Sequence, residues 1–301
     1  MSNLNMQLVK KELFRLNLAR FLIISLTLVT VVGLVYCIKY EPPWFEFFVA
    51  FCGLYFFIFI FSYGYYLNYV LETSYLLLTR NFGFEIEKKM EDFPSKKEYK
   101  AATKEYEIEK AIFSGVAFRL GLFMRLWNIE YDNFLKGTRD NYKFTMQDFT
   151  LGFTTRHRDA RYKQLTIDTP FPIKCDIIIR KNRLIKWNLI NRLKQMKIQN
   201  REFEKCYETF TNNFEEAQKL LNEDFIYELL KYNKMYGRQI EVIITPKKIF
   251  LLNQISVWDL IFRQSWNWNI FASPKKQFNK IWADIDNFLN VLPVVSFLGK
   301  K

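Results

Sequence analysis

The sequence predicts an α+β protein: an N-terminal two-helix transmembrane hairpin followed by a cytoplasmic domain of helices packed on a mostly antiparallel sheet. Three observations lead to this fold class. Two uncharged apolar runs stand near the N-terminus, apolar and polar side chains then alternate in the middle of the chain, and helical patterns return around these segments. With 301 residues, half of them hydrophobic, the chain can bury a core, which excludes intrinsic disorder.

The first apolar run, residues 21–38, contains no charged residue. Because a helix rises about 1.5 Å per residue, this run can cross nearly all of a roughly 30 Å hydrocarbon core. A second uncharged run, residues 47–67, follows after a short loop. A cleaved signal peptide is the alternative for the first run, but the run is longer than the usual ~7 to 15 apolar residues. We therefore expect a basic N-terminal segment over residues 1–20 and a transmembrane helical hairpin over residues 21–69.

Basic residues flank the expected hairpin unevenly. Lys10, Lys11, Arg15 and Arg20 precede the first run, whereas the connecting loop carries only Lys39. Under the positive-inside rule, this asymmetry places both termini in the cytoplasm. Neither run contains an ionisable acid, base or histidine, which argues against an ion or proton pathway.

Juxtamembrane helices are expected over residues 70–113. Apolar residues recur at spacings of three and four as far as Ile86, so the second membrane helix should continue beyond the bilayer. Ser95 and Glu98 then form an S-x-x-E capping box, which predicts a further helix over residues 96–113.

A cytoplasmic α+β domain is expected over residues 114–301. Its first strands begin at Tyr142, and the alternation changes phase at Phe149, which implies a bulge or turn near Gln147 and Asp148.

Two later segments predict the middle of the sheet. Residues 173–180 alternate between apolar and polar side chains and read as a strand. Residues 240–245 and 248–252 flank T-P-K-K, where Pro246 favours a turn, and predict a hairpin that is apolar on both faces. Such a hairpin belongs at the centre of a sheet.

Helix signals surround these strands. Asn213 can cap a helix over residues 214–219, and Asn222 can cap one over residues 223–232. A final amphipathic helix, opened by Ser273 and Pro274 and stopped by Pro293, should dock on the sheet through the apolar residues between 278 and 292. Its other, polar face carries Asp284 and Asp286.

The sequence contains no visible catalytic or cofactor-binding template. Neither G-x-x-x-x-G-K-[ST] nor G-x-G-x-x-G occurs, and Ser114 lacks the G-x-S-x-G setting of a nucleophile elbow. One histidine, His157, and four scattered cysteines do not supply a common zinc set. We therefore expect no catalytic residue, no cofactor and no metal site, and the sequence favours a protein that is not an enzyme.

The densest basic stretch follows the strand expected at residues 173–180. Arg180, Lys181, Arg183 and Lys186 are our candidate contacts for anionic lipid headgroups or an acidic partner protein. An ordinary solvated loop is the alternative. The net charge of +13 would also suit nucleic acid, but no RNA-reading motif or recognition helix accompanies it, so nucleic acid is disfavoured.

One segment carries a recognisable motif. Its positions are Glu202, Phe203, Lys205 and Tyr207, then Phe210, Thr211 and Asn213, then Glu216, Ala217, Leu220 and Leu221, then Phe225, Leu229 and Leu230. This pattern resembles an uncharacterised family of bacterial membrane proteins, domain of unknown function 3137, in which the first four positions form a strand. Gln218 and Asn213 depart from it, where the family has an Arg and an acid. The resemblance implies a membrane-anchored cytoplasmic domain but no known substrate.

Two functional classes remain. The favoured one is a membrane-anchored scaffold or binding protein that presents its α+β domain to a protein or lipid headgroup at the inner face of the membrane. The alternative is a membrane-bound enzyme whose site assembles only in three dimensions. The expected location is the bacterial cell (inner) membrane, as a multi-pass protein with both termini cytoplasmic.

Overall fold

The computed structural model describes residues 3–40, 46, 83–86, 95–119, 126–153, 160–182, 193–255 and 274–299. The chain divides into two compact units. The first comprises Met1–Gly83 with Gln264–Trp282, and the second comprises Phe84–Arg263 with Ala283–Lys301.

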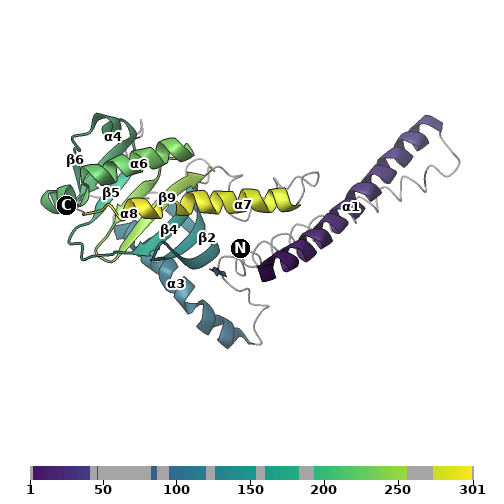
Figure 1. Cartoon of the computed structure of the whole chain (residues 1–301), viewed down its shortest axis with the longest axis horizontal. Helices are drawn as coiled ribbons and strands as arrows, with labels where there is room; N and C mark the ends of the chain where they lie inside the picture. The colour runs from purple at the N-terminus through teal and green to yellow at the C-terminus, as the bar shows by residue number, and fades with distance from the viewer. Residues whose placement is uncertain are drawn as a thin grey trace. The chain divides into compact units, whose positions relative to one another are not determined.

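Among the described residues of the first unit is a long helix, α1 (Asn3–Tyr40), drawn in purple in Figure 1. Its segment Asn17–Tyr40 has a mean hydropathy of 2.6 and is long enough to cross a membrane, and its described side chains are exposed or half-buried. Within the described part of the chain, this is one candidate span. The second apolar run, residues 47–67, lies outside the described residues, as does most of the expected juxtamembrane helix before Gly83.

Within the second unit, the described residues form one antiparallel sheet of nine strands, in the order β1-β2-β3-β4-β9-β8-β5-β7-β6. The strands are β1 (Glu85–Ile86), β2 (Leu126–Arg139), β3 (Tyr142–Phe153), β4 (Ala160–Asp168), β5 (Ile177–Lys181), β6 (Lys194–Met196), β7 (Tyr207–Thr211), β8 (Glu241–Ile244) and β9 (Lys248–Ile255). The expected α+β class, with a mostly antiparallel sheet, is confirmed.

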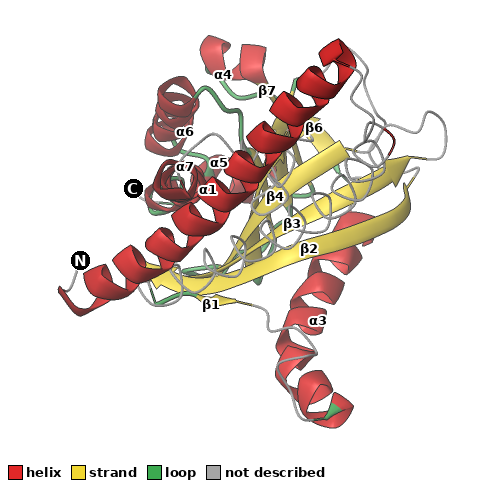
Figure 2. Ribbon diagram, turned by 90° about the vertical axis from the view of Figure 1, so that its right-hand side faces the viewer, coloured by secondary structure: helices red, strands yellow, loops and turns green. Residues whose placement is uncertain are grey.

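Helices cover both faces of this sheet. They are α3 (Lys96–Arg119), α4 (Arg201–Cys206), α5 (Phe214–Leu220), α6 (Glu223–Tyr236), α7 (Pro274–Leu289) and α8 (Leu292–Val295). Figure 2 shows α3 on one side of the strands and α5 and α6 on the other. The strands are therefore buried on both faces, which explains why several of them read as continuous apolar runs.

The core beneath α3 is largely aromatic. Phe113 of α3 is fully buried, and its ring centroid lies 5.1 Å from that of Phe149 on β3 and 5.3 Å from that of Phe250 on β9. Tyr162 of β4 stacks on Phe149 at 5.2 Å. These side chains form one cluster with Ile178 of β5, so α3 spans the middle strands of the sheet.

The opposite face packs against the C-terminal helices. Ile285 and Phe288 of α7 are buried, and Leu292 of α8 is fully buried. The Tyr232 hydroxyl on α6 donates a hydrogen bond of 2.8 Å to the backbone carbonyl of Asn287. The predicted docking of the final helix on the sheet is thus observed, although the helix ends at Leu289 and a short helix follows around Pro293.

The T-P-K-K hairpin lies at the centre of the sheet, as predicted. β9 pairs with β4 on one side and with β8 on the other, and β8 continues to β5. Thr245 closes the turn, because its hydroxyl donates to the Lys248 carbonyl (2.8 Å) and accepts from the Lys248 amide (3.0 Å).

Strand β3 is longer than predicted, and the expected break is in its partner. β3 runs without interruption through Gln147 and Asp148. The register shift that faces these residues lies in β2, between Asp132 and Phe134. The phase change therefore reflects a strand that is buried on both faces, with Phe149 pointing to α3 and Asp148 to the other side.

The caps of the two middle helices are confirmed. The Asn213 side chain accepts a hydrogen bond from the Glu216 amide (3.2 Å), and the Asn222 side chain accepts one from the Phe225 amide (2.8 Å). Each cap satisfies a backbone N–H that the helix itself leaves unpaired. Helix α6 runs on to Tyr236 and stops at Gly237, whose φ of 62° is the left-handed conformation that favours glycine.

Four local predictions were wrong. The strand expected over residues 173–180 begins only at Ile177. Ile86 pairs with Leu135 in strand β1 and does not continue a helix. The motif residues Glu202 to Lys205 form helix α4, capped by Asn200, and the strand starts only at Tyr207. Helix α3 continues past Phe113 to Arg119, because its apolar face keeps packing on the sheet as far as Ala117.

Candidate functional site

The predicted basic contact begins at Arg180, the fourth residue of β5. Antiparallel pairing places it opposite Glu208 of β7, whose carboxylate accepts hydrogen bonds from Arg180 Nη2 (2.9 Å) and Nε (3.1 Å). The guanidinium also lies over the Phe210 ring, 4.6 Å from its centroid. The Arg180 charge is therefore neutralised within the sheet.

The rest of that stretch is only partly described. Lys181 ends β5 half-buried, and its backbone amide donates to the Glu241 carboxylate at 3.3 Å. Arg183 and Lys186 lie outside the described residues. The structure therefore pairs Arg180 with an acid and leaves the other three candidates as a prediction.

Exposed basic side chains do occur beside this point. Lys194 and Lys197 lie at and just beyond strand β6, and Arg201 begins α4. β6 is at the end of the strand order, so these three side chains form a basic edge next to β7. We call Lys194, Lys197 and Arg201 the basic edge.

A buried ionic network on the C-terminal helix face was not anticipated from the sequence. Lys163 of β4 and its cross-strand partner Asp148 of β3 are both fully buried. The Lys163 ammonium forms an ion pair with Asp284 of α7. The other carboxylate oxygen of Asp284 accepts a hydrogen bond of 2.5 Å from Arg238 Nη2.

This network holds α7 at a fixed position on the sheet. Lys163 and Arg238 share the Asp284 carboxylate, so removing its charge would take an opposite charge away from the buried Lys163 ammonium. A second link lies beside it: Arg139, at the end of β2, donates to Asp286 (2.6 Å) and to the Asn290 side chain (2.8 Å). The expectation that Asp284 faces solvent is corrected, because only 12% of its side chain is exposed.

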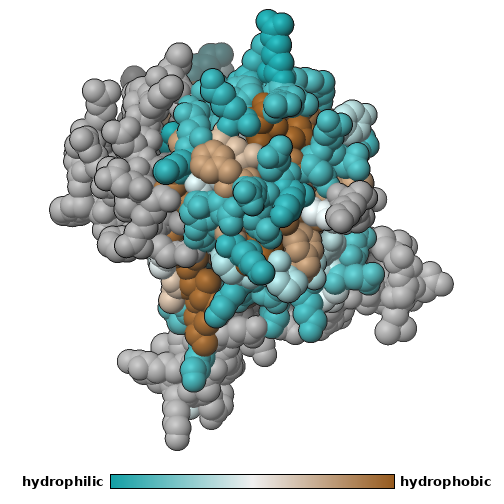
Figure 3. Space-filling view, turned by 90° about the vertical axis from the view of Figure 1, so that its left-hand side faces the viewer, coloured by the Kyte–Doolittle hydropathy of each residue, from teal (hydrophilic) through white to brown (hydrophobic). Residues whose placement is uncertain are grey.

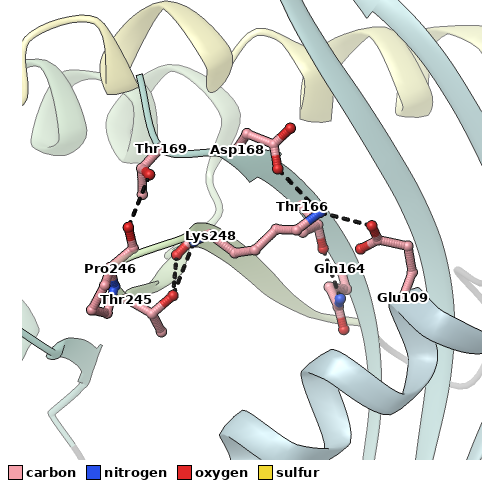
Figure 4. Close-up of polar contacts among 8 residues, drawn as sticks. All are labelled: Glu109, Gln164, Thr166, Asp168, Thr169, Thr245, Pro246 and Lys248. Atoms are coloured by element: carbon pink, nitrogen blue, oxygen red, sulfur yellow. Dashed lines mark hydrogen bonds and ion pairs between the residues drawn. The ribbon is translucent and has the colours of Figure 1, made fainter. Parts of the chain in front are cut away.

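A third charged group lies on the α3 face of the sheet (Figure 4). Lys248 of β9 reaches Glu109 of α3 (2.7 Å) and Asp168 of β4 (3.1 Å). Burial alone would lower the pKa of the Lys248 ammonium, but the two carboxylates outweigh burial and raise its pKa above the ordinary value. Lys248 therefore ties the helix on this face to two central strands.

These ion pairs link helices and strands of the fold to one another. Glu208, Asp284, Asp286 and Glu109 each pair with a base, and these ion pairs join a helix to a strand or one strand to another. In the described ranges, no three His, Cys, Asp or Glu side chains gather so as to hold a metal ion. His157 lies outside those ranges.

The sequence offered no signal for Lys163 and Asp284 as a pair. They are far apart in the chain, and only the pairing of β3 with β4 and the docking of α7 bring them together. β4 itself was not predicted, so Lys163 did not stand out as a lysine inside a strand.

The comparisons with known proteins concern the same region. Residues 164–296 match the family model described as "Protein of unknown function (DUF3137)". The resemblance drawn from the sequence is confirmed. The match covers less than half of the chain and includes Arg180, Glu208, Arg238 and Asp284.

Other comparisons add little. No curated protein matches the chain. A solved structure with partial likeness is the "crystal structure of the mycobacterial trehalose monomycolate transport factor A, TtfA", with 8% sequence identity and a TM-score of 0.29. That match covers 56% of this chain and 75% of the other.

Proposed function

We propose that this protein is a membrane-anchored scaffold or binding protein that holds its α+β domain at the inner face of the bacterial cell membrane. The observation that carries the proposal is α1, whose segment Asn17–Tyr40 combines a mean hydropathy of 2.6 with described side chains that are exposed or only half-buried. Such a surface is unfavourable in water and favourable in a bilayer.

The threonine hydroxyls of this segment are also compatible with a bilayer. Thr27 donates its hydroxyl proton to the Ile23 carbonyl (2.7 Å), and Thr30 donates to the Leu26 carbonyl (2.9 Å). In hydrocarbon, polar groups must be satisfied inside the helix because no water is present. Large apolar side chains such as Leu28, Val29 and Val32 remain exposed and available to lipid.

The direction of insertion follows from the flanking charges. Arg15 and Arg20 precede the apolar part of α1 and Lys39 follows it, with further lysines at the N-terminal end. The greater number of basic residues on the N-terminal side favours a cytoplasmic N-terminus. A second span over residues 47–67 would return the chain, so that the domain and the C-terminus also lie in the cytoplasm.

Contact with anionic lipid is the binding activity that the charges support. Because Arg180 is occupied by Glu208, the contact would depend on Lys181, Arg183 and Lys186 together with the basic edge. A tethered domain gains about 1 kcal/mol for each Lys or Arg near an anionic leaflet.

Labelling of substituted cysteines in intact cells tests this topology. Pro43→Cys should react with a membrane-impermeant thiol reagent, whereas Lys300→Cys should react only after the cells are opened. The unaltered chain reports labelling of the native cysteines. Labelling of Lys300→Cys in intact cells, with none of Pro43→Cys, would contradict the proposed orientation.

A further inference from the structure

Helix α6 carries an exposed stripe that no packing in its own domain explains. Outside α1, the described residues include four exposed large apolar side chains, and two of them, Tyr227 and Met235, lie on α6, each 64% exposed. Elsewhere the surface seen in Figure 3 is mainly hydrophilic, with small separate apolar groups. Exposed apolar groups on an otherwise polar helix face are typical of a contact surface.

The stripe is symmetric about Lys231. At about 100° per residue, Tyr227 and Met235 lie roughly 40° to either side of Lys231 and about 6 Å before and after it along the axis. Glu228 and Lys234 flank Lys231 in the same way, three residues to either side. We call these five residues the α6 stripe.

The charges of the stripe have a direction. Its N-terminal half contains Glu228, preceded by the exposed Asp224, and its C-terminal half contains Lys234. Lys234 also pairs with Glu202 of the same chain (2.7 Å), but both side chains are more than half exposed and such pairs are weak, so Lys234 can also meet a partner's carboxylate. Two parallel copies would place like charges at the same level, whereas two antiparallel copies place the acidic half of each against the basic half of the other. A two-fold axis through Lys231 is the arrangement that also brings Tyr227 to the level of Met235.

From this self-complementarity, we infer that the partner of the α6 stripe is a second copy of this chain, with the two helices antiparallel about Lys231. The two Lys231 side chains that meet at the axis are compensated within each copy. Lys231 Nζ lies 2.9 Å from Glu228 Oε1, and 5.8 Å from the centroid of the Tyr227 ring.

The pairing is suited to a tethered protein. One helix pair buries less than the roughly 800 Å² per partner of a standard interface, so association is weak in dilute solution. Confinement of both copies to one membrane raises their effective concentration. To this extent the inference rests on the proposed function.

Cross-linking through Lys231 tests the arrangement on the full chain in membranes. Lys231→Cys places the two new thiols of a pair at the axis, and mild oxidation should join them. Lys219→Cys, at an exposed lysine of α5 outside the stripe, is the matched control, and the unaltered chain reports joining through native cysteines. We expect about tenfold more disulfide-linked dimer for Lys231→Cys than for the control.

Charge reversal on α6 is a second test of the pairing. In the Lys231→Cys chain, Glu228→Lys places lysines opposite Lys234 and should reduce joining about tenfold. Adding Lys234→Glu exchanges the two charges and should restore joining. Circular dichroism of each variant reports whether the fold is retained.

The outcomes separate this inference from the anchoring proposal, because the same samples report how much chain sediments with the membrane. Sedimented chain that joins no more than the Lys219→Cys control, or joins equally after Glu228→Lys, would overturn the self-association alone. Release of the chain from the membrane would overturn the anchoring. Released chain that still joins through Lys231→Cys would support the pairing.

Discussion

Lys163 of β4 and Asp284 of α7 form an ion pair in which the lysine side chain is fully buried. The pair joins a central strand to the last long helix of the domain. Arg238 shares the same carboxylate, so a single acid connects three segments that are distant in the sequence.

Asp284→Asn should destabilise the domain strongly. The substitution removes the charge that compensates the buried Lys163 ammonium, and breaking a buried pair typically costs 3–5 kcal/mol. We expect about 3 kcal/mol, at the low end, because Asp148 lies on the adjacent strand. Urea unfolding measures the change.

The matched control is Glu202→Gln, which breaks the pair between Glu202 and Lys234. Both of these side chains are more than half exposed, and exposed pairs contribute little. The control should leave the unfolding midpoint unchanged. Equal midpoints for the two variants would show that the buried pair does not hold α7.

Phe113→Ala should loosen α3 from the sheet. Phe113 is fully buried against Phe149 and Phe250, and removal of a buried Phe costs about 3–5 kcal/mol. Ile108→Ala on the same helix, where the side chain is 49% exposed, should change stability by less than about 0.5 kcal/mol. Similar losses for both substitutions in thermal unfolding would contradict the assigned face of α3.

Stability should fall as the pH rises from 9 towards 11, in part through Cys175. Burial, with smaller contributions from Glu216 and Asp176, raises the pKa of the Cys175 thiol from 9.0 to about 11. The unfolded chain therefore loses this proton first, so the contribution is fully present below pH 9 and is lost as the pH rises through the folded pKa. Unfolding free energies measured across this range should fall more steeply for the unaltered chain than for Cys175→Ala. Parallel profiles would assign the alkaline loss to other groups.

The basic edge should support binding to anionic vesicles in a chain that lacks α1 and the second apolar run. A shortened chain, residues 83–301, retains the Phe84 side chain, which packs on Phe144 with ring centroids 5.5 Å apart. It should float with anionic liposomes but not with neutral ones, and less so at 1 M salt, where the Debye length falls to about 3 Å.

Reversal of the basic edge to Glu at Lys194, Lys197 and Arg201 should weaken this flotation. The unfolding midpoint should change little, because exposed charges contribute little to stability. The triple reversal, unlike a change at Arg180, leaves the pair with Glu208 intact. If the variant floats as well as the unaltered shortened chain, these three residues are ordinary solvated side chains and do not bind the lipid.

Local signals predicted the elements that depend on neighbouring residues. Asn213 and Asn222 cap their helices as expected, and the turn at Pro246 forms the central hairpin. The motif at Glu202 was misread as a strand because the Asn200 cap, which starts a short helix there, was overlooked.

Long-range pairings were not accessible from the sequence. Strand β2 has no regular alternation, since its register shifts opposite Gln147 and Asp148. Arg180 stands at the end of the strand expected from the sequence and looks like a free charge there, whereas in the structure β7 brings Glu208 beside it. The Lys163 network needs two strands and a docked helix, which no spacing in the chain reveals.

Alkaline carbonate extraction of cell membranes decides whether α1 anchors the protein in a membrane. The full-length chain, identified by its intact mass, should stay in the membrane pellet. A variant with Leu26→Arg and Val29→Arg in the exposed apolar part of α1 should be released in larger amounts, because charges at mid-span are costly in hydrocarbon. Recovery of the unaltered chain in the soluble fraction, or as a shortened product lacking α1, would contradict the account.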